Sequence, residues 1–201
     1  MNYVIVGLGN PGEEYEGTRH NTGRMAVKEF AKKFKALQWK EEKKIKAQTA
    51  KVKTGKNSAL LVLPDTYMNK SGHAVGPLVK SKKAAETLVV VHDDMDIPFG
   101  KIKISFNRSS GGHRGVESII KAVGTEKFIR MRMGISPTNA KGIVKKPQGE
   151  KFVSDFILGK FETYEQDKLK KVMKVAADGL EILVKEGKDI AAGIINSRKS
   201  V

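Results

Sequence analysis

YVIVGL, residues 3–8, is a run of mostly β-branched and aliphatic side chains that ends at Gly9-Asn10-Pro11-Gly12. An apolar run that meets turn-forming residues at once predicts a buried strand. TLVVV, residues 87–91, is a second run of this kind, and it stops at the polar segment 92–96. Strands with nearly continuous apolar sequence are typical of parallel sheets that helices cover on both faces. The two runs therefore predict an α/β fold.

The rest of the chain supplies further elements for such a sheet. We expect strands at 45–53, 58–63, 101–106 and 128–135, the first two forming a hairpin around residues 54–57. Apolar residues at helical spacing predict helices over about 21–37, 73–83, 115–123 and 162–186. No repeat or Pro/Ser-rich linker divides the sequence. We predict one domain over residues 1–201, in which a twisted, mixed and mostly parallel sheet lies between two layers of helices.

The charge of the chain favours a polyanionic partner. The 201 residues include 38 Lys and Arg against 22 Asp and Glu, a net charge of +16. Counterion release would make binding to nucleic acid favourable, while a general solubility charge is the alternative. An acidic membrane surface is disfavoured, because the basic residues are spread over several segments instead of one amphipathic helix.

Composition also excludes several kinds of site. The chain has no cysteine, which rules out disulfides, thiol nucleophiles and thiolate metal sites. It has no run of about 18 apolar residues, and its first residues lack the basic region of an export signal. We expect a soluble protein of the cytoplasm, and we have no sequence signal for an oligomer, so a monomer is the default.

Gly7-Leu8-Gly9-Asn10-Pro11-Gly12 has the spacing of a dinucleotide-binding fingerprint. That fingerprint needs its third glycine at the start of a helix that packs on the strand. Pro11 and the following EEYEGTRH do not predict such a helix, so we reject a dinucleotide site. A tight turn explains the glycines but leaves the polar residues from Asn10 to Asn21 unexplained.

Histidines and acids gather after the predicted strands. Three of the four histidines, His20, His92 and His113, fall in predicted loops, and Asp93 directly follows an apolar strand. A carboxylate that accepts a hydrogen bond from one imidazole nitrogen leaves the other nitrogen basic. The acids could instead cap a turn, pair with lysines, or bind a hydrolytic metal with the histidines. The metal site is disfavoured because no H-x-H or H-E-x-x-H pair is present.

The nucleophile of a hydrolase built on these residues would be water. Ser71 and Ser110 lack the G-x-S-x-G context of an activated serine. A water-attack hydrolase needs a base, a group that orients it, and amide donors where oxyanion charge develops. His20, Asp93 and the side-chain amides of Asn10 and Asn69 supply these types.

Four motifs in a fixed order resemble the bacterial-type peptidyl-tRNA hydrolase family. They are VGLGNPGEEYEGTRHNTG at 6–23, PDTYMNKSGHAV at 64–75, VHDDMDIPFGKIKI at 91–104 and SSGGHRGVESI at 109–119. Weaker matches follow at 128–135 and 153–161. The resemblance implies hydrolysis of the ester that joins a peptide to the 3′-terminal ribose of tRNA. It also implies that no cofactor or metal is required and that the partner is the acceptor end of peptidyl-tRNA.

The resemblance assigns roles to individual residues. It implies that His20 activates water, that Asp93 holds His20, and that Asp94 and Asp96 are structural. It associates Asn10 with telling N-blocked peptidyl-tRNA from free aminoacyl-tRNA. It places Tyr15, Tyr67 and Asn69 at the tRNA end, and Met68 as an apolar wall or an ordinary packing residue.

Arg114 departs from the family pattern. The family commonly reads G-G-H-N-G where this chain has Gly112-His113-Arg114-Gly115, so an asparagine that contacts substrate is replaced. Arginine cannot accept a hydrogen bond, but it can hold a phosphate with two parallel donors. We expect Arg114 to bind substrate in this different way. The alternative to the enzyme as a whole is a non-catalytic RNA-binding protein on the same fold, since folds are reused.

Overall fold

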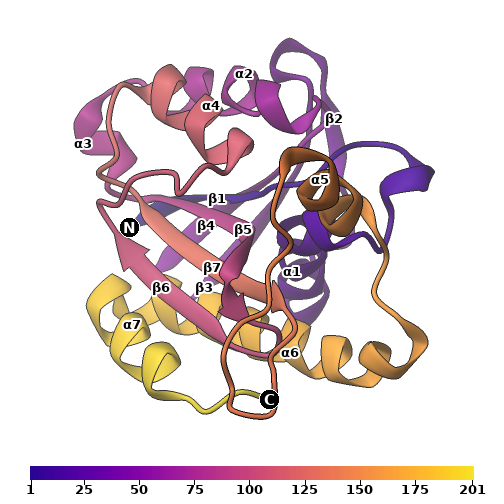
Figure 1. The fold of residues 1–201 in the computed structure, drawn as a ribbon. Coiled ribbons are helices and arrows are strands. Elements are labelled where there is room, and N and C mark those ends of the chain that lie inside the picture. The colour runs from indigo at the N-terminus through magenta and orange to yellow at the C-terminus, as the bar shows by residue number, and fades with distance from the viewer.

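The computed structural model describes all 201 residues and contains one seven-stranded sheet between helices (Figure 1). The strands lie in the order β2-β3-β4-β1-β5-β7-β6. Their bounds are β1 Asn2–Gly7, β2 Lys40–Glu42, β3 Ala47–Thr54, β4 Asn57–Pro64, β5 Leu88–Pro98, β6 Ile102–Phe106 and β7 Ile129–Ser136. The helices are α1 Thr22–Lys33, α2 Gly72–Val75, α3 Lys82–Ala85, α4 Arg114–Val123, α5 Glu150–Leu158, α6 Gln166–Glu186 and α7 Lys188–Ser197. The predicted α/β fold with a mixed sheet is confirmed.

The four central strands are parallel and the edges are antiparallel. β1 pairs in parallel with β4 and β5, and β5 pairs in parallel with β7. At one edge β3 pairs antiparallel with β2 and β4, and at the other β6 pairs antiparallel with β7. The carboxyl ends of the central strands therefore meet at one edge, where ligand sites of open α/β sheets lie.

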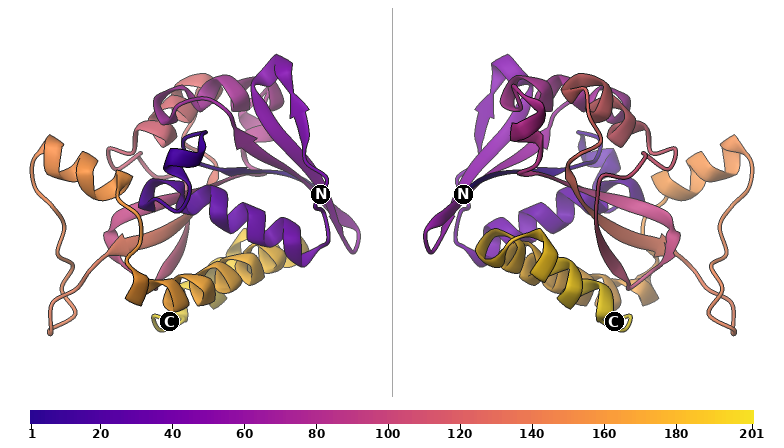
Figure 2. Two further views of the ribbon diagram at one scale, coloured as in Figure 1. Left: turned by 90° about the vertical axis from the view of Figure 1, so that its right-hand side faces the viewer. Right: turned by 90° about the vertical axis from the view of Figure 1, so that its left-hand side faces the viewer.

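Helices cover both faces of the sheet. α1, α6 and α7 pack on one face over the larger core, which includes Ile5, Phe30, Met131 and Leu180. α2 and α4 pack on the other face over a smaller core. α5 stands at one end of the sheet, apart from both layers (Figure 2). None of the helices combines the length and the apolar character that a bilayer crossing needs.

The parts of the sequence with clear periodicity gave the right elements. The predicted hairpin is present, with β3 and β4 paired from Ala47↔Pro64 to Thr54↔Asn57. The turn after β1 leads into a 3-10 helix, Glu13–Tyr15, and not into an α-helix packed on the strand. This agrees with the sequence analysis, which rejected a dinucleotide site because no such helix was predicted there. β2, α5 and α7 were not predicted from periodicity.

The helix predicted over 21–37 ends earlier, at Lys33, and two other elements differ more from expectation. The predicted helix over 73–83 is broken into α2 and α3, with a 3-10 turn at Gly76–Leu78 between them. Pro77 lies in that turn, and proline has no N–H to continue a helix. The second strand does not stop at Val91 but continues to Pro98, because β7 pairs with His92, Asp93 and Asp94 as well. The polar segment is thus part of the strand.

Gly23 allows α1 to approach the sheet closely. A Cβ atom at this position would lie 2.2 Å from the Val91 carbonyl oxygen and 2.8 Å from the Leu8 backbone. Only glycine avoids this clash with fixed backbone. The close approach brings residues 19–21, a 3-10 helix directly before α1, to the end of β5.

Candidate active site

A cleft of about 1020 Å³ lies beyond the carboxyl ends of the central strands. Its walls come from the turn after β1, the 3-10 helix Met68–Lys70 after β4, the end of β5, the turn before α4, and α5. His20 and Asp93 both line it, although 73 residues separate them in the sequence. The predicted clustering of His, Asp and Asn side chains at this edge is therefore present.

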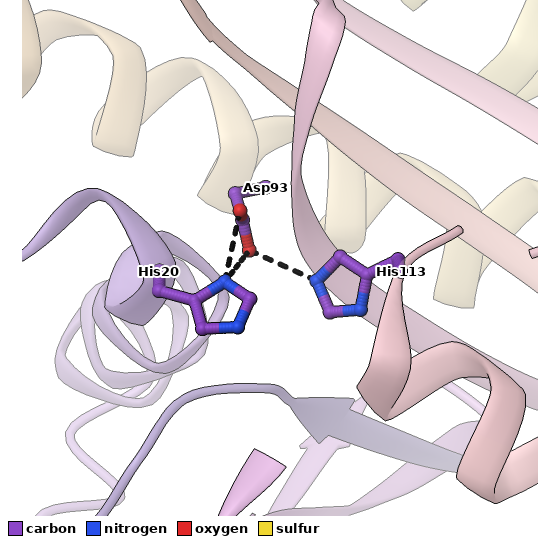
Figure 3. A group of neighbouring side chains, drawn as sticks. All are labelled: His20, Asp93 and His113. Atoms are coloured by element: carbon purple, nitrogen blue, oxygen red, sulfur yellow. Dashed lines mark hydrogen bonds and ion pairs between the residues drawn. The ribbon is translucent and has the colours of Figure 1, made fainter. Parts of the chain in front are cut away.

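Asp93 lies between two histidines (Figure 3). His20 Nδ1 is 3.0 Å from each carboxylate oxygen of Asp93. His113 Nε2 is 3.0 Å from Asp93 Oδ1. A carboxylate without a proton accepts from both rings, so His20 carries its proton on Nδ1 and its Nε2 is left as a basic atom.

Burial and charge have opposite effects on these groups. Burial lowers the pKa of His20, but the charge of Asp93 and its hydrogen bond outweigh burial and raise that pKa above its ordinary value. The Arg114 guanidinium acts against this increase. For Asp93, burial raises the pKa, yet the two histidines together hold it well below its usual range. Asp93 is therefore a carboxylate at neutral pH.

Asn10 is held by one hydrogen bond from the Met68 backbone and by two hydrogen bonds with the Asn21 side chain. Its Oδ1 accepts from the Met68 N–H at 2.8 Å. Its own N–H donates to Asn21 Oδ1 at 2.8 Å, and Asn21 Nδ2 donates to the Asn10 carbonyl at 2.9 Å. With Oδ1 occupied by a donor, the free polar group of the Asn10 side chain is its Nδ2 donor.

The cleft brings together most of the predicted site residues. Tyr67, Met68, Asn69 and Arg114 line it with Asn10, His20 and Asp93. Tyr67 is 58% exposed, and Met68 is buried. Tyr15, the last residue of the 3-10 helix Glu13–Tyr15, does not line the cleft.

Ion pairs cross the mouth of the cleft. Arg114 Nη2 is 2.7 Å from Glu150 Oε1, at the start of α5, and both side chains are largely exposed. Lys146 Nζ is 2.5 Å from Asp96 Oδ1. Deeper in the cleft, Arg132 Nε is 2.7 Å from Asp94 Oδ2. Asp94 and Asp96 are thus paired with cations.

Neither candidate serine is hydrogen-bonded to a histidine. Ser71 is fully buried and donates to the Met68 carbonyl at 2.8 Å. Ser110 donates to Glu117 at 3.1 Å. The arrangement fits a water nucleophile better than a serine nucleophile.

Sequence reasoning missed several residues of the cleft. From the sequence, His113 is only one of three histidines in predicted loops, yet its ring contacts Asp93 directly. His92 packs edge-on against His113 at 4.7 Å between ring centroids, and burial lowers its pKa well below the usual value, so its ring is neutral. Three arginines, Arg108, Arg130 and Arg132, add positive charge to the cleft. Residues two apart in a strand lie on the same face of a sheet, so the sequence predicts Arg130 and Arg132 on one face. The sequence does not show which strands lie beside theirs, and so it does not place them in the cleft.

A metal ion would find three ligand atoms here. The donor atoms of His20, Asp93 and His113 all lie within 4.8 Å of one another. Asp93 already accepts an N–H from one nitrogen of each histidine, however, and a metal bound at these atoms would have to replace both N–H groups. The hydrogen-bonded arrangement accounts for all three side chains without a metal.

Comparison with known proteins gives one consistent result. The family model described as peptidyl-tRNA hydrolase matches residues 4–201. The peptidyl-tRNA hydrolase of Thermodesulfovibrio yellowstonii is 40% identical over 196 residues, covering 96% of this chain and 98% of the relative. That of Aquifex aeolicus is 41% identical over 174 residues, covering 86% and 85%. The crystal structure of peptidyl-tRNA hydrolase from Acinetobacter baumannii superposes with a TM-score of 0.86 at 31% identity, covering 98% of this chain and 95% of that one.

Proposed function

Because this chain belongs to the peptidyl-tRNA hydrolase family, we propose that His20, held by Asp93, is the base that activates water in its reaction. The protein is a hydrolase that cleaves the ester bond of peptidyl-tRNA. It thereby releases tRNA for further translation. The observation that carries the proposal is the contact of His20 Nδ1 with both oxygens of Asp93, which leaves Nε2 free and basic in the cleft.

In the proposed reaction, His20 Nε2 takes a proton from water while the water oxygen attacks the ester carbonyl carbon. Negative charge develops on the carbonyl oxygen, and we propose that Asn10 Nδ2 or Asn69, both of which line the cleft, donates to it. When the bond from carbon to the ribose oxygen breaks, the imidazolium returns its proton to that oxygen. The products are a peptide carboxyl group and a free tRNA terminus, and Asp93 keeps its charge throughout.

The Asn10 donor also supplies a reason for selecting N-blocked substrates. An amide N–H can pair with the carbonyl of a peptide group. A free α-ammonium is itself only a donor, so near Asn10 Nδ2 it would be desolvated without an acceptor. We propose that Asn10 discriminates in this way.

The remaining lining residues are proposed to hold the tRNA end. Tyr67 has an exposed ring that can stack on a base, and Asn69 is an exposed amide beside it. Arg114 is proposed to bind phosphate once it leaves Glu150, and Tyr15 is proposed to contact tRNA outside the cleft.

We also propose that residues 1–201 form one domain and act as a cytoplasmic monomer without cofactor or metal. All the proposed site residues except Tyr15 line one cleft at one sheet edge. Sedimentation equilibrium checks the monomer, for which the chain mass is 22.1 kDa. A species of twice that mass at micromolar concentration would refute it.

The test compares release of tRNA from N-acetylated aminoacyl-tRNA by the wild type, His20→Ala and His73→Ala. His73 is exposed and outside the cleft, so its variant is a matched control for loss of a histidine. We expect His20→Ala to lower kcat about 10²–10⁴-fold with tRNA affinity unchanged. Near-normal turnover by His20→Ala would end the assignment. Loss of wild-type release in a chelator would instead point to the metal site of His20, Asp93 and His113.

A further inference from the structure

His113 uses both nitrogens of its ring, and the two contacts join α4 to Asp93. Its Nδ1 accepts from the Gly115 N–H at 3.2 Å and the Val116 N–H at 3.4 Å, which makes it the N-cap of α4. A ring nitrogen that accepts carries no proton. Nε2 must then carry the proton, and it donates to Asp93 Oδ1 at 3.0 Å. The backbone of α4 therefore selects the tautomer of His113.

From this geometry we infer that His113 is a positioning residue, which holds Asp93 in place for His20. The N-terminus of α4 strengthens the hydrogen bond from His113 to Asp93. The inference rests on the proposed role of His20 as base. Two amide donors on Nδ1, at the positive end of a ten-residue helix, make the Nε2–H a stronger donor. Asp93, bonded from two sides, is kept in one orientation.

The second bond on Asp93 also limits how strongly Asp93 stabilises a protonated His20. Oδ1 is shared, because it accepts from His20 and from His113. When the His113 bond is removed, more of the carboxylate charge is available to His20. The pKa of His20 should then rise, so that more of the base is protonated and inactive at a given pH.

Other charged groups near His20 are unchanged by a substitution at His113. β5 contributes His92, which is buried and neutral, besides Asp93. The start of α4 contributes Arg114, and α5 contributes Glu150, Lys151 and Asp155 to the same cleft. In the two segments next to His20, Arg19 is paired with Glu165 and Arg24 with Asp65.

Two substitutions separate the contacts of His113. In His113→Asn, the side-chain oxygen takes the place of Nδ1 and still caps α4, but no donor reaches Asp93. In His113→Gln, the longer amide carries a donor to the position of Nε2, while the cap is weakened. Glu117→Gln is the control, because it removes an acidic group from the first turn of α4, keeps an oxygen that can accept from Ser110, and makes no contact with Asp93.

The experiment measures kcat, KM and the pH dependence of kcat/KM for the three variants, with His20→Ala alongside. For His113→Asn we expect kcat to fall about tenfold at unchanged KM. The acid limb of the profile, where kcat/KM falls as the pH is lowered, should move to higher pH by about 0.5–1 unit. His113→Gln should restore the acid limb. Glu117→Gln should lower Tm without moving the limb.

The inference fails if His113→Asn keeps the wild-type profile while His20→Ala is inactive. It also fails if the Asn and Gln variants lose activity equally at equal Tm. Activity in His20→Ala would refute the base itself and so identify a different failure. Should the Asn variant not fold, nitrogen NMR of the wild-type imidazoles decides: a proton on Nδ1 of His113 overturns the inference, and an unprotonated Nδ1 supports it.

Discussion

At the residue scale, the site depends on one carboxylate that serves two imidazoles. The Asp93 side chain is buried, and its charge is stabilised by His20 and His113. The two partners differ in role: His20 Nε2 stays free in the cleft, whereas both nitrogens of His113 are occupied. One histidine is therefore available for proton transfer and the other is not.

Asp93→Asn should move the acid limb in the opposite direction from His113→Asn. An amide has no charge to stabilise a protonated His20, so the pKa of His20 falls and the limb of kcat/KM shifts to lower pH. The amide can also present N–H to His20 Nδ1, which forces the proton to Nε2 and removes the base. We expect kcat to fall about 10²–10⁴-fold. A pH–rate profile checks both effects, and a limb displaced to higher pH would contradict this account.

At the element scale, a buried ion pair fixes the segment that carries His20. Arg19 Nη2 is 2.7 Å from Glu165 Oε2, and both side chains are only 10% exposed. The Arg19 guanidinium also lies over the rings of Phe156 and Phe161, at 4.8 and 4.9 Å from their centroids. The contacts connect the 3-10 helix of His20 with α5 and with the chain leading to α6. The position of the base thus depends on elements more than 130 residues away in the sequence.

Glu165→Ala should destabilise the protein markedly. It leaves the buried Arg19 charge without its partner, a change that costs about 3–5 kcal/mol. The control is Lys170→Ala, which breaks the exposed pair with Asp167 and should change stability by less than about 0.5 kcal/mol. Urea unfolding measures both. Equal effects of the two substitutions would show that the Arg19 pair has no special role.

At the scale of the whole molecule, net charge and cleft charge point to the same partner. The chain carries +16, and Arg108, Arg130 and Arg132 lie in the cleft itself. Not all of this charge is free, because Arg132 is paired with Asp94 and Arg114 with Glu150. Phosphates of the tRNA would be held by the cations that remain unpaired and by those that exchange partners on binding.

Affinity for tRNA should therefore fall steeply with salt. We expect log affinity to decrease with log salt by roughly 0.7–0.9 for each phosphate contact. Binding titrations from low to physiological salt, made with the inactive His20→Ala variant, measure this slope without turnover. Arg108→Ala should reduce the slope by about one contact if Arg108 binds phosphate. If the affinity of the His20→Ala variant for tRNA did not change with salt, the electrostatic proposal would be contradicted.

Local patterns were enough to predict six of the seven strands, the hairpin, helices α1, α4 and α6, and the family. Apolar runs, helical spacing and turn residues depend on near neighbours in the chain, and the motifs from residue 6 to residue 119 keep their order without reference to a fold. Such patterns also predicted that Asn10, His20 and Asp93 follow the two most apolar strands. They failed where pairing with a segment distant in the sequence sets the length of a strand. Pairing with β7 extends β5 into the polar segment 92–96.

Which groups touch was decided only by the packing of distant segments. Gly23 lets α1 come within contact of β1 and β5, and this brings His20 to Asp93 across 73 residues. The cap of α4 then turns His113 toward the same carboxylate, a relation that no spacing in the chain encodes. Hydrogen bonds require atoms within about 3 Å, and only strand register and helix packing position side chains that closely.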